Sequence, residues 1–237
     1  MTECRDQVLE VFGDLACFSR PELKVERFSY PIMTPSAARG IFDAIYCKPI
    51  EFRWQVTKIE MLSAPSYIAL RRNEVKETAS EATVLGWATG RSEPEPIWAD
   101  GEGDVRGRTQ RQTMALKDAR YRLHAEIRPW PGHEEKQSGL EAQFRRRAKH
   151  GKCFYQPYFG CREFVAYFEL AEPADTLTQP VAWSADLGWM LYDVFDLNRR
   201  GNCATHPAIS LFHAEVNSGV MDIPPYESNE VMKTHPE

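Results

Sequence analysis

Residues 115–128 read ALKDARYRLHAEIR and contain the pattern that decides the fold. Small or apolar side chains alternate there with charged or polar ones, so that Ala119, Tyr121, Leu123, Ala125 and Ile127 interleave with Asp118, Arg120, Arg122, His124, Glu126 and Arg128. A period of two residues is typical of a β-strand, because successive side chains point to opposite faces of a sheet. The pattern therefore predicts a strand in a sheet with one covered face and one open polar face.

Three further strands are expected on either side of this one. The segments 8–12, 51–62 and 164–170 are rich in apolar, aromatic or β-branched residues, and the last two alternate in the same way. Segments of this length that end at turn residues are typical of strands. The sequence thus predicts four strands for the first part of the chain.

Two helices are expected between the strands. The first begins at Thr34-Pro35, because threonine is a frequent N-cap and proline is accepted at the first helical position. It ends before Lys48-Pro49, so that Tyr46 lies in its last turn. The second helix is expected to start with a capping box over 138–141 and to end at Gly151. Its expected buried stripe consists of Leu140, Phe144 and Ala148.

The order strand, helix, strand, strand, helix, strand predicts an α+β fold of the ferredoxin-like, or RRM-like, type. This domain is expected to cover residues 1–172. Strands expected at 189–195 and 208–216 belong to a small antiparallel β-rich domain, residues 173–237. The irregular segment 73–107, rich in proline, glycine and charge, is expected to form a hairpin or a functional loop.

The composition of the 237 residues is that of an ordinary globular protein, with a net charge of -5. No stretch approaches the ~18 apolar residues of a membrane span, and no signal peptide is recognisable, so we expect a cytoplasmic protein without a membrane partner. The six cysteines are scattered without a C-x-x-C pair, so neither a metal nor another cofactor is expected. The acidic average at first argues against a nucleic-acid ligand.

The charge is nevertheless unevenly distributed along the chain. Residues 106–128 carry seven Lys and Arg against two acidic residues, and residues 139–162 carry six against one, so each segment has a net charge of +5. Neighbouring basic segments can neutralise phosphates, which points to RNA or DNA, whereas a solvated helix face is the alternative. The candidate RNA-binding residues on these segments are Arg108, Arg111, Lys117, Arg120, Arg145, Arg146 and Arg147.

Five segments carry a resemblance to a known family: VFGDLACF at 11–18, TPSAARGIFDAIYCKP at 34–49, RNEV at 72–75, TQRQTMALKD at 109–118 and QPYFGCREF at 156–164. In this order they resemble the CRISPR-associated Cas-five family, type I-C (Dvulg) subtype. The resemblance implies a ferredoxin-like RAMP domain with a small β-domain. It also implies an endoribonuclease that cuts precursor CRISPR RNA at the repeat hairpin. The mature guide RNA is then expected to stay bound, together with other type I-C Cascade subunits.

The chemistry implied by the resemblance is metal-independent. The ribose 2′-hydroxyl attacks the adjacent phosphate and leaves a 2′,3′-cyclic phosphate and a 5′-hydroxyl. This reaction requires a group that takes or orients the 2′-OH proton, a cation for the phosphorane charge, and an acid for the leaving oxygen. The resemblance places a functional tyrosine at the end of the first helix, and Tyr46 matches it within IYCKP. The alternative is that Tyr46 only packs against the sheet. The resemblance also matches Gly160 and Arg162 to a glycine-containing loop of the family, in which the glycine lets the backbone approach a phosphate closely and the arginine clamps it, so both are candidate RNA-binding residues. A β-bulge is the alternative for this loop.

One departure from the family pattern concerns the second helix. The family commonly carries a Lys-His pair shortly before an F-x-R-R motif, whereas the matching positions here are Gly139-Leu140, which can neither carry charge nor transfer a proton. Lys149 and His150, at the other end of the helix, are the expected substitutes, and Lys136 or His133 are the alternative. The departure also favours a second function, a catalytically weak or inactive RNA-binding subunit. DNA is a further ligand that the same basic surface suits.

Overall fold

The computed structural model describes residues 6–23, 25–75, 78–94, 99, 108–171, 178–201 and 207–233. The path through its main sheet is β6-β1-β5-β3-β9, and every pairing along this path is antiparallel. Two further strands, β2 and β4, also pair with β5. In chain order the strands of this sheet are β1 Gln7–Ala16, β2 Arg27–Phe28, β3 Phe52–Met61, β4 Tyr67–Val75, β5 Arg108–Pro129, β6 Tyr167–Leu170 and β9 Val220–Asp222.

A second, smaller sheet has the order β10-β8-β7. Its strands are β7 Ala185–Asp193, β8 Ser210–Val216 and β10 Val231–Lys233. β8 coincides closely with the strand expected at 208–216, whereas β7 begins four residues before the strand expected at 189–195 and ends two residues before it. The expected boundary between residues 1–172 and 173–237 remains a prediction, but the C-terminal region also contributes β9 to the main sheet.

Helices α1 (Pro35–Ile45) and α3 (Gln137–Lys149) pack together on one face of the main sheet. Three aromatic side chains join them to it, because the ring of Phe144 on α3 lies 4.8 Å from Trp54 on β3, and the ring of Phe42 on α1 lies 4.9 Å from Trp54. The predicted stripe of α3 is confirmed, since Leu140, Phe144 and Ala148 are all buried. Among the described residues, no helix is long and apolar enough to cross a lipid bilayer.

The two helix starts differ in how well the sequence predicts them. The N-cap of α1 is confirmed, because the Ala37 amide donates to the Thr34 hydroxyl oxygen at 3.3 Å. The capping box of α3 is wrong: the N-cap position is Lys136, without a side-chain cap, and Glu141 accepts instead from Gln137 at 3.1 Å. Tyr46 also lies one residue beyond α1, in an extended conformation, rather than in the last turn.

Strand β5 follows the expected alternation on one face only. The apolar set from Ala119 to Ile127 is buried, as predicted. The opposite face is not open at its centre, because Arg122 is 5% exposed and His124 is 9% exposed. Two carboxylates permit this burial: Glu60 on β3 pairs with Arg122 at 2.7 Å, and Asp6, directly before β1, pairs with His124 at 2.7 Å.

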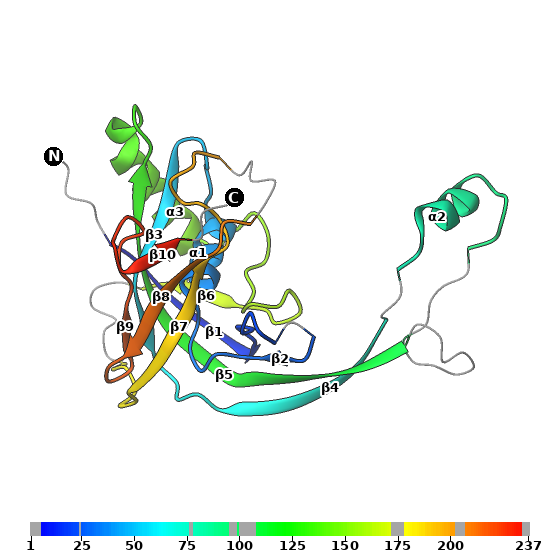
Figure 1. Cartoon of the computed structure of the whole chain (residues 1–237). Coiled ribbons are helices and arrows are strands. Elements are labelled where there is room, and N and C mark those ends of the chain that lie inside the picture. Colours follow the sequence, from blue (N-terminus) through cyan, green and yellow to red (C-terminus); the bar gives the residue numbers. More distant parts are fainter. Residues whose placement is uncertain are drawn as a thin grey trace.

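The distal half of β5 pairs with β4 in a two-stranded arm that extends away from the rest of the molecule (Figure 1). Of the segment 73–107, in which a hairpin or a functional loop is expected, only residues 73–75 take part in this pairing. The helix α2 (Glu81–Ala88) was not expected; it has no buried residue and lies beyond the end of the arm (Figure 1). Residues 76–77, 95–98 and 100–107 of the same segment lie outside the described part of the chain.

Candidate functional site

The backbone that carries Tyr46 is held at the end of α1 by two other elements. The Trp54 indole N–H donates to the Tyr46 carbonyl at 2.8 Å, and the Arg147 Nε of α3 donates to the Ile45 carbonyl at 2.6 Å. The Arg147 guanidinium also lies over the ring of Phe154, 4.2 Å from its centroid. A cation at a helix C-terminus satisfies unpaired carbonyls and complements the helix dipole. Arg147 therefore fixes the place from which Tyr46 projects.

The Tyr46 side chain is covered and packs against the ring of Phe52, with 5.4 Å between the ring centroids. Only 4% of the residue is exposed. Burial raises the pKa of the phenol above its usual value, although the nearby charges of Lys48 and Arg147 act in the opposite direction. The phenol thus keeps its proton at neutral pH. This geometry suits a group that orients a hydroxyl or donates to an oxygen, and it argues against a phenolate base.

A turn of residues 48–51 follows Tyr46 and gathers cations around one carboxylate. The Lys48 ammonium lies 3.2 Å from the Glu51 carboxylate, and the Lys136 ammonium lies 3.8 Å from its other oxygen. The hydrogen bond between Lys48 and Glu51 raises the pKa of Lys48 and lowers the pKa of Glu51. Two ammonium groups therefore stand at Glu51, in the turn that follows Tyr46.

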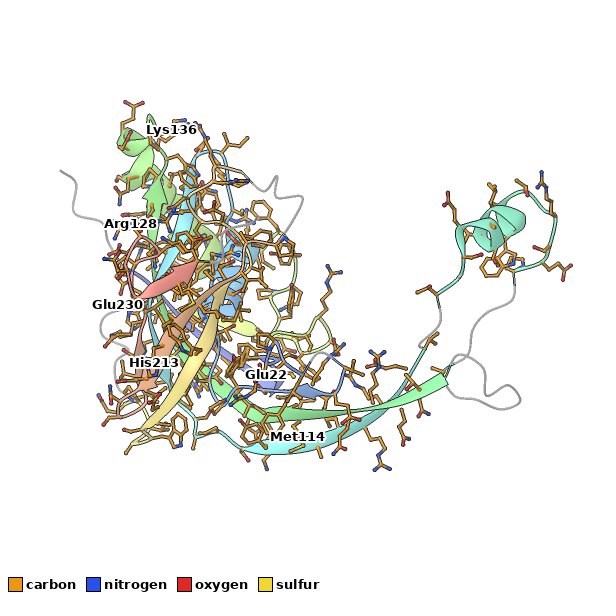
Figure 2. The ribbon with its side chains drawn as sticks, in the orientation of Figure 1. Glu22, Met114, Arg128, Lys136, His213 and Glu230 are labelled. Atoms are coloured by element: carbon orange, nitrogen blue, oxygen red, sulfur yellow. The ribbon has the colours of Figure 1, made fainter. Side chains whose placement is uncertain are left out.

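The loop between β5 and α3 joins this cluster. The Trp130 indole donates to the Pro49 carbonyl at 2.9 Å, and the Trp130 amide donates to the Glu51 carbonyl at 2.9 Å. This loop supplies both Lys136 and His133, and Figure 2 shows Lys136 at the end of the molecule remote from the arm. The structure thus brings the alternative pair, Lys136 and His133, to the turn that follows Tyr46.

The expected pair, Lys149 and His150, is placed differently. His150 is the C-cap residue of α3, where its amide contacts the Arg147 carbonyl at 3.1 Å. Both side chains are exposed. Within the described residues, no hydrogen bond or ion pair joins either side chain to Tyr46. A part for Lys149 and His150 in proton transfer stays a prediction without a structural contact.

The expected basic stripe on β5 is largely neutralised by its neighbours. Arg120 donates to Glu10 at 2.6 Å, and Arg111 on the arm pairs with Glu74 at 3.1 Å. Lys117 is exposed, and the side chain of Arg108 is not among those that the structure describes. In the core, Arg120 and Arg122 also point away from the face that α3 covers. The expectation that β5 and α3 form one basic surface is therefore wrong for this part of the strand, because side chains alternate between the faces.

The three arginines of α3 have separate surroundings. Arg146 is exposed and donates to Gln143 at 2.5 Å, whereas Arg147 is committed to the end of α1. Arg145 is partly buried. Of the three, Arg146 fits the predicted phosphate contact best, because its charge is open to solvent.

Gly160 has a structural reason to be glycine apart from any ligand. Its φ is +79°, and a Cβ atom there would lie 2.0 Å from the Cys17 carbonyl oxygen. Together with Tyr158 and the first turns of α1, it lines a cavity of about 270 Å³. Arg162, two residues on, is exposed. The expected phosphate contacts of Gly160 and Arg162 stay predictions.

Three residues of the cluster around the turn after Tyr46 were missed by sequence reasoning. Lys48 stands within IYCKP and Glu51 follows shortly after it, so their closeness to Tyr46 was available from spacing alone. Arg200 contacts both His133 and the Ile50 carbonyl, but nothing in its sequence context indicates this.

These features define a class of protein: an α+β protein with a covered tyrosine beside clustered cations, an arrangement suited to a phosphate ester. A family model described as CRISPR-associated protein (Cas_Cas5) matches residues 8–234. A relative from Mannheimia succiniciproducens, "CRISPR pre-crRNA endoribonuclease Cas5d", is 40% identical over 95% of this chain and 97% of its own length. A Thermus thermophilus protein of the same name is 35% identical over 95% and 94%.

A solved structure named "Crystal Structure of CRISPR-associated Protein" has a TM-score of 0.66 at 19% identity and covers 96% of both chains. At this identity the likeness shows a shared fold. The family model and the two relatives span nearly the whole chain. The chain therefore belongs to the Cas5 family of CRISPR-associated proteins.

Proposed function

We propose that this chain is an endoribonuclease that cuts precursor CRISPR RNA and that Tyr46, Lys48, Lys136 and His133 form its cleavage site. The names of the two relatives support the activity. The observation that carries the site is the meeting of a protonated phenol, two charged lysines and a histidine at the turn after α1.

The proposed reaction proceeds by attack of the ribose 2′-oxygen on the adjacent phosphorus. A bond forms between the 2′-oxygen and phosphorus while the bond from phosphorus to the 5′-oxygen breaks. The 2′-OH proton passes to a water molecule, and the departing 5′-oxygen takes a proton from water, so that bonds and protons balance. Tyr46 orients the 2′-hydroxyl, because its phenol retains its proton. Lys48 and Lys136 stabilise the negative charge that develops on the phosphate oxygens, as fixed cations do in such transition states.

The strand order supports a ferredoxin-like RAMP domain as the frame of this site. Numbered by the predicted strands, β6-β1-β5-β3 is the order fourth, first, third, second, with α1 after the first strand and α3 after the third. This is the arrangement proposed for a split βαβ fold. It places the ends of α1 and α3 against the same face of the sheet, where the proposed site lies.

A hollow of about 360 Å³ lies on the face of β3 and β5 opposite the two helices, adjoins the cluster at Trp130, and is proposed to hold part of the RNA strand. Its lining includes Trp130, Arg53 and Arg128, and Arg128 remains half exposed although it pairs with Glu126. An aromatic ring and guanidinium groups can contact bases and phosphates of a single strand. The processed RNA is proposed to stay bound and to join this chain to other Cascade subunits, and DNA binding by an exposed basic residue such as Arg146 stays a prediction.

The test uses the full-length protein and its cognate repeat RNA in EDTA. We expect cleavage at one position, with a 2′,3′-cyclic phosphate on the upstream product. A deoxyribose at that position should abolish cleavage and leave binding intact. Absence of cleavage, or cleavage that requires added metal, would contradict the proposed activity.

The second candidate is an RNA-gripping subunit without catalysis. The specific observation in its favour is the burial of Tyr46, of which only 4% is exposed. Under this alternative the protein binds repeat RNA tightly, but the RNA stays whole over long incubation. The same EDTA assay therefore separates the two candidates.

A further inference from the structure

Arg200 bridges two segments that border the proposed site. Its Nε donates to the Ile50 carbonyl at 2.6 Å, and its Nη2 lies 2.5 Å from His133 Nε2. The neighbouring Gly201 amide also donates to the Pro49 carbonyl at 3.1 Å. The C-terminal region thus holds the turn after Tyr46 against the loop that carries His133.

The contact between Arg200 and His133 also determines the state of the imidazole. A guanidinium group has only donors, so the His133 nitrogen that faces it must accept. His133 is therefore neutral in this arrangement, with its proton on Nδ1. The Nδ1 atom is buried and has no hydrogen-bond partner among the described residues. A buried polar atom without a protein partner is uncommon in folded proteins, and a water molecule or a substrate atom can serve as its partner.

The position of Arg200 connects it to the lysines of the site. His133 and Lys136 belong to one short loop and 3-10 turn, in which the Lys136 amide donates to the His133 carbonyl at 3.0 Å. Lys136 and Lys48 meet at Glu51, the residue directly after Ile50. A displacement of the Arg200 bridge would therefore change the spacing between the two lysines that we assign to the phosphate.

We propose that Arg200 is a positioning residue for RNA cleavage: by bridging Ile50 and His133 it holds His133 with its proton on Nδ1 and sets the spacing of Lys48 and Lys136 beside Tyr46. This inference rests on the proposed function. A guanidinium fork suits the task, because it presents two donors in fixed geometry, whereas a lysine presents a single nitrogen.

The first measurement is cleavage of repeat RNA by Arg200→Ala, under single-turnover conditions with saturating protein. We expect the rate to fall about tenfold while the affinity for RNA changes less than about twofold, because displaced catalytic groups slow the chemical step. Arg200→Lys should not restore the rate. The matched control is Arg199→Ala, since Arg199 is 72% exposed and contacts only the nearby Asp196 in the described structure.

A double-substitution cycle and a spectrum complete the test. Because Arg200 acts through His133, the Arg200→Ala/His133→Ala protein should cleave no more slowly than His133→Ala. The ¹⁵N spectrum of the labelled imidazole, assigned with His133→Asn, should show a proton on Nδ1 and none on Nε2. Wild-type rates in Arg200→Ala or Arg200→Lys, additive losses in the cycle, or a proton on Nε2 would overturn the inference. A wild-type protein that fails to cleave overturns the proposed function itself.

Discussion

The two ends of α3 each present a lysine and a histidine, but their surroundings differ. At the start of the helix, Lys136 pairs with Glu51, and His133 contacts Arg200. At the far end, Lys149 and His150 are exposed, and neither side chain has a hydrogen bond or ion pair among the described residues. Similar residue types are thus placed once in a fixed arrangement and once on an open surface. The comparison teaches that a catalytic role is indicated by the partners that fix a side chain, more than by its type.

The largest effect is expected from Tyr46→Phe, which tests whether the cluster around the turn after Tyr46 is the cleavage site. Loss of the phenol should lower the cleavage rate by about 10²-fold or more, because the 2′-hydroxyl is no longer held in line for attack on phosphorus. The stacking on Phe52 survives the substitution, so the fold should be retained. A single-turnover assay measures the rate, and a change within twofold would remove Tyr46 from the mechanism.

A pair of double variants tests the two ends of α3 directly. His133→Ala/Lys136→Ala should cleave about 10–10²-fold more slowly, because a cation beside the phosphate and its fixed neighbour are lost together. Lys149→Ala/His150→Ala removes the same residue types and should stay within about threefold of the wild type. The reverse order of these rates would assign catalysis to the open end of the helix.

Arg146 and Arg147 allow the same contrast to be made for stability. Arg147→Ala should lower the free energy of unfolding by about 1–3 kcal/mol, because a helix carbonyl loses its donor and Phe154 loses its cation partner. Arg146→Ala should change it by less than about 0.5 kcal/mol, as is usual for an exposed side chain. Urea denaturation of both variants measures the difference, and equal values would show that Arg147 is not a structural cap.

The smallest expected effect is a loss of stability at alkaline pH that depends on Tyr46. Burial raises the pKa of the folded phenol, so it stays protonated where the unfolded chain, with a pKa of about 10, ionises. Its contribution to stability is complete below about pH 10 and is lost as the pH rises through the folded pKa. The wild type should therefore lose slightly more stability than Tyr46→Phe above pH 10 in parallel denaturation curves. An identical pH dependence would show that the phenol is not buried in solution.

Local patterns predicted the frame of the molecule well. The alternation in β5, the Thr34 cap and the Leu140–Ala148 stripe each depend on neighbours within a few residues, and all three are found. The cleavage cluster was only partly predicted, because Glu51, Lys136 and Arg200 meet through tertiary contacts. Arg200 lies 150 residues from Ile50, whose carbonyl it binds, and no local spacing indicates that contact.

Strand β5 is a single backbone of 22 residues shared by the arm and the core. Its distal half pairs with β4, its proximal half lies between β1 and β3, and the next residues form the loop of Trp130 and His133. At about 3.3 Å per residue such a strand approaches 70 Å in length. Asp118, with a φ of +53°, marks the one residue of β5 in the left-handed region. A displacement of the arm is consequently passed through one continuous strand, which contains the left-handed residue Asp118, to the loop that carries His133.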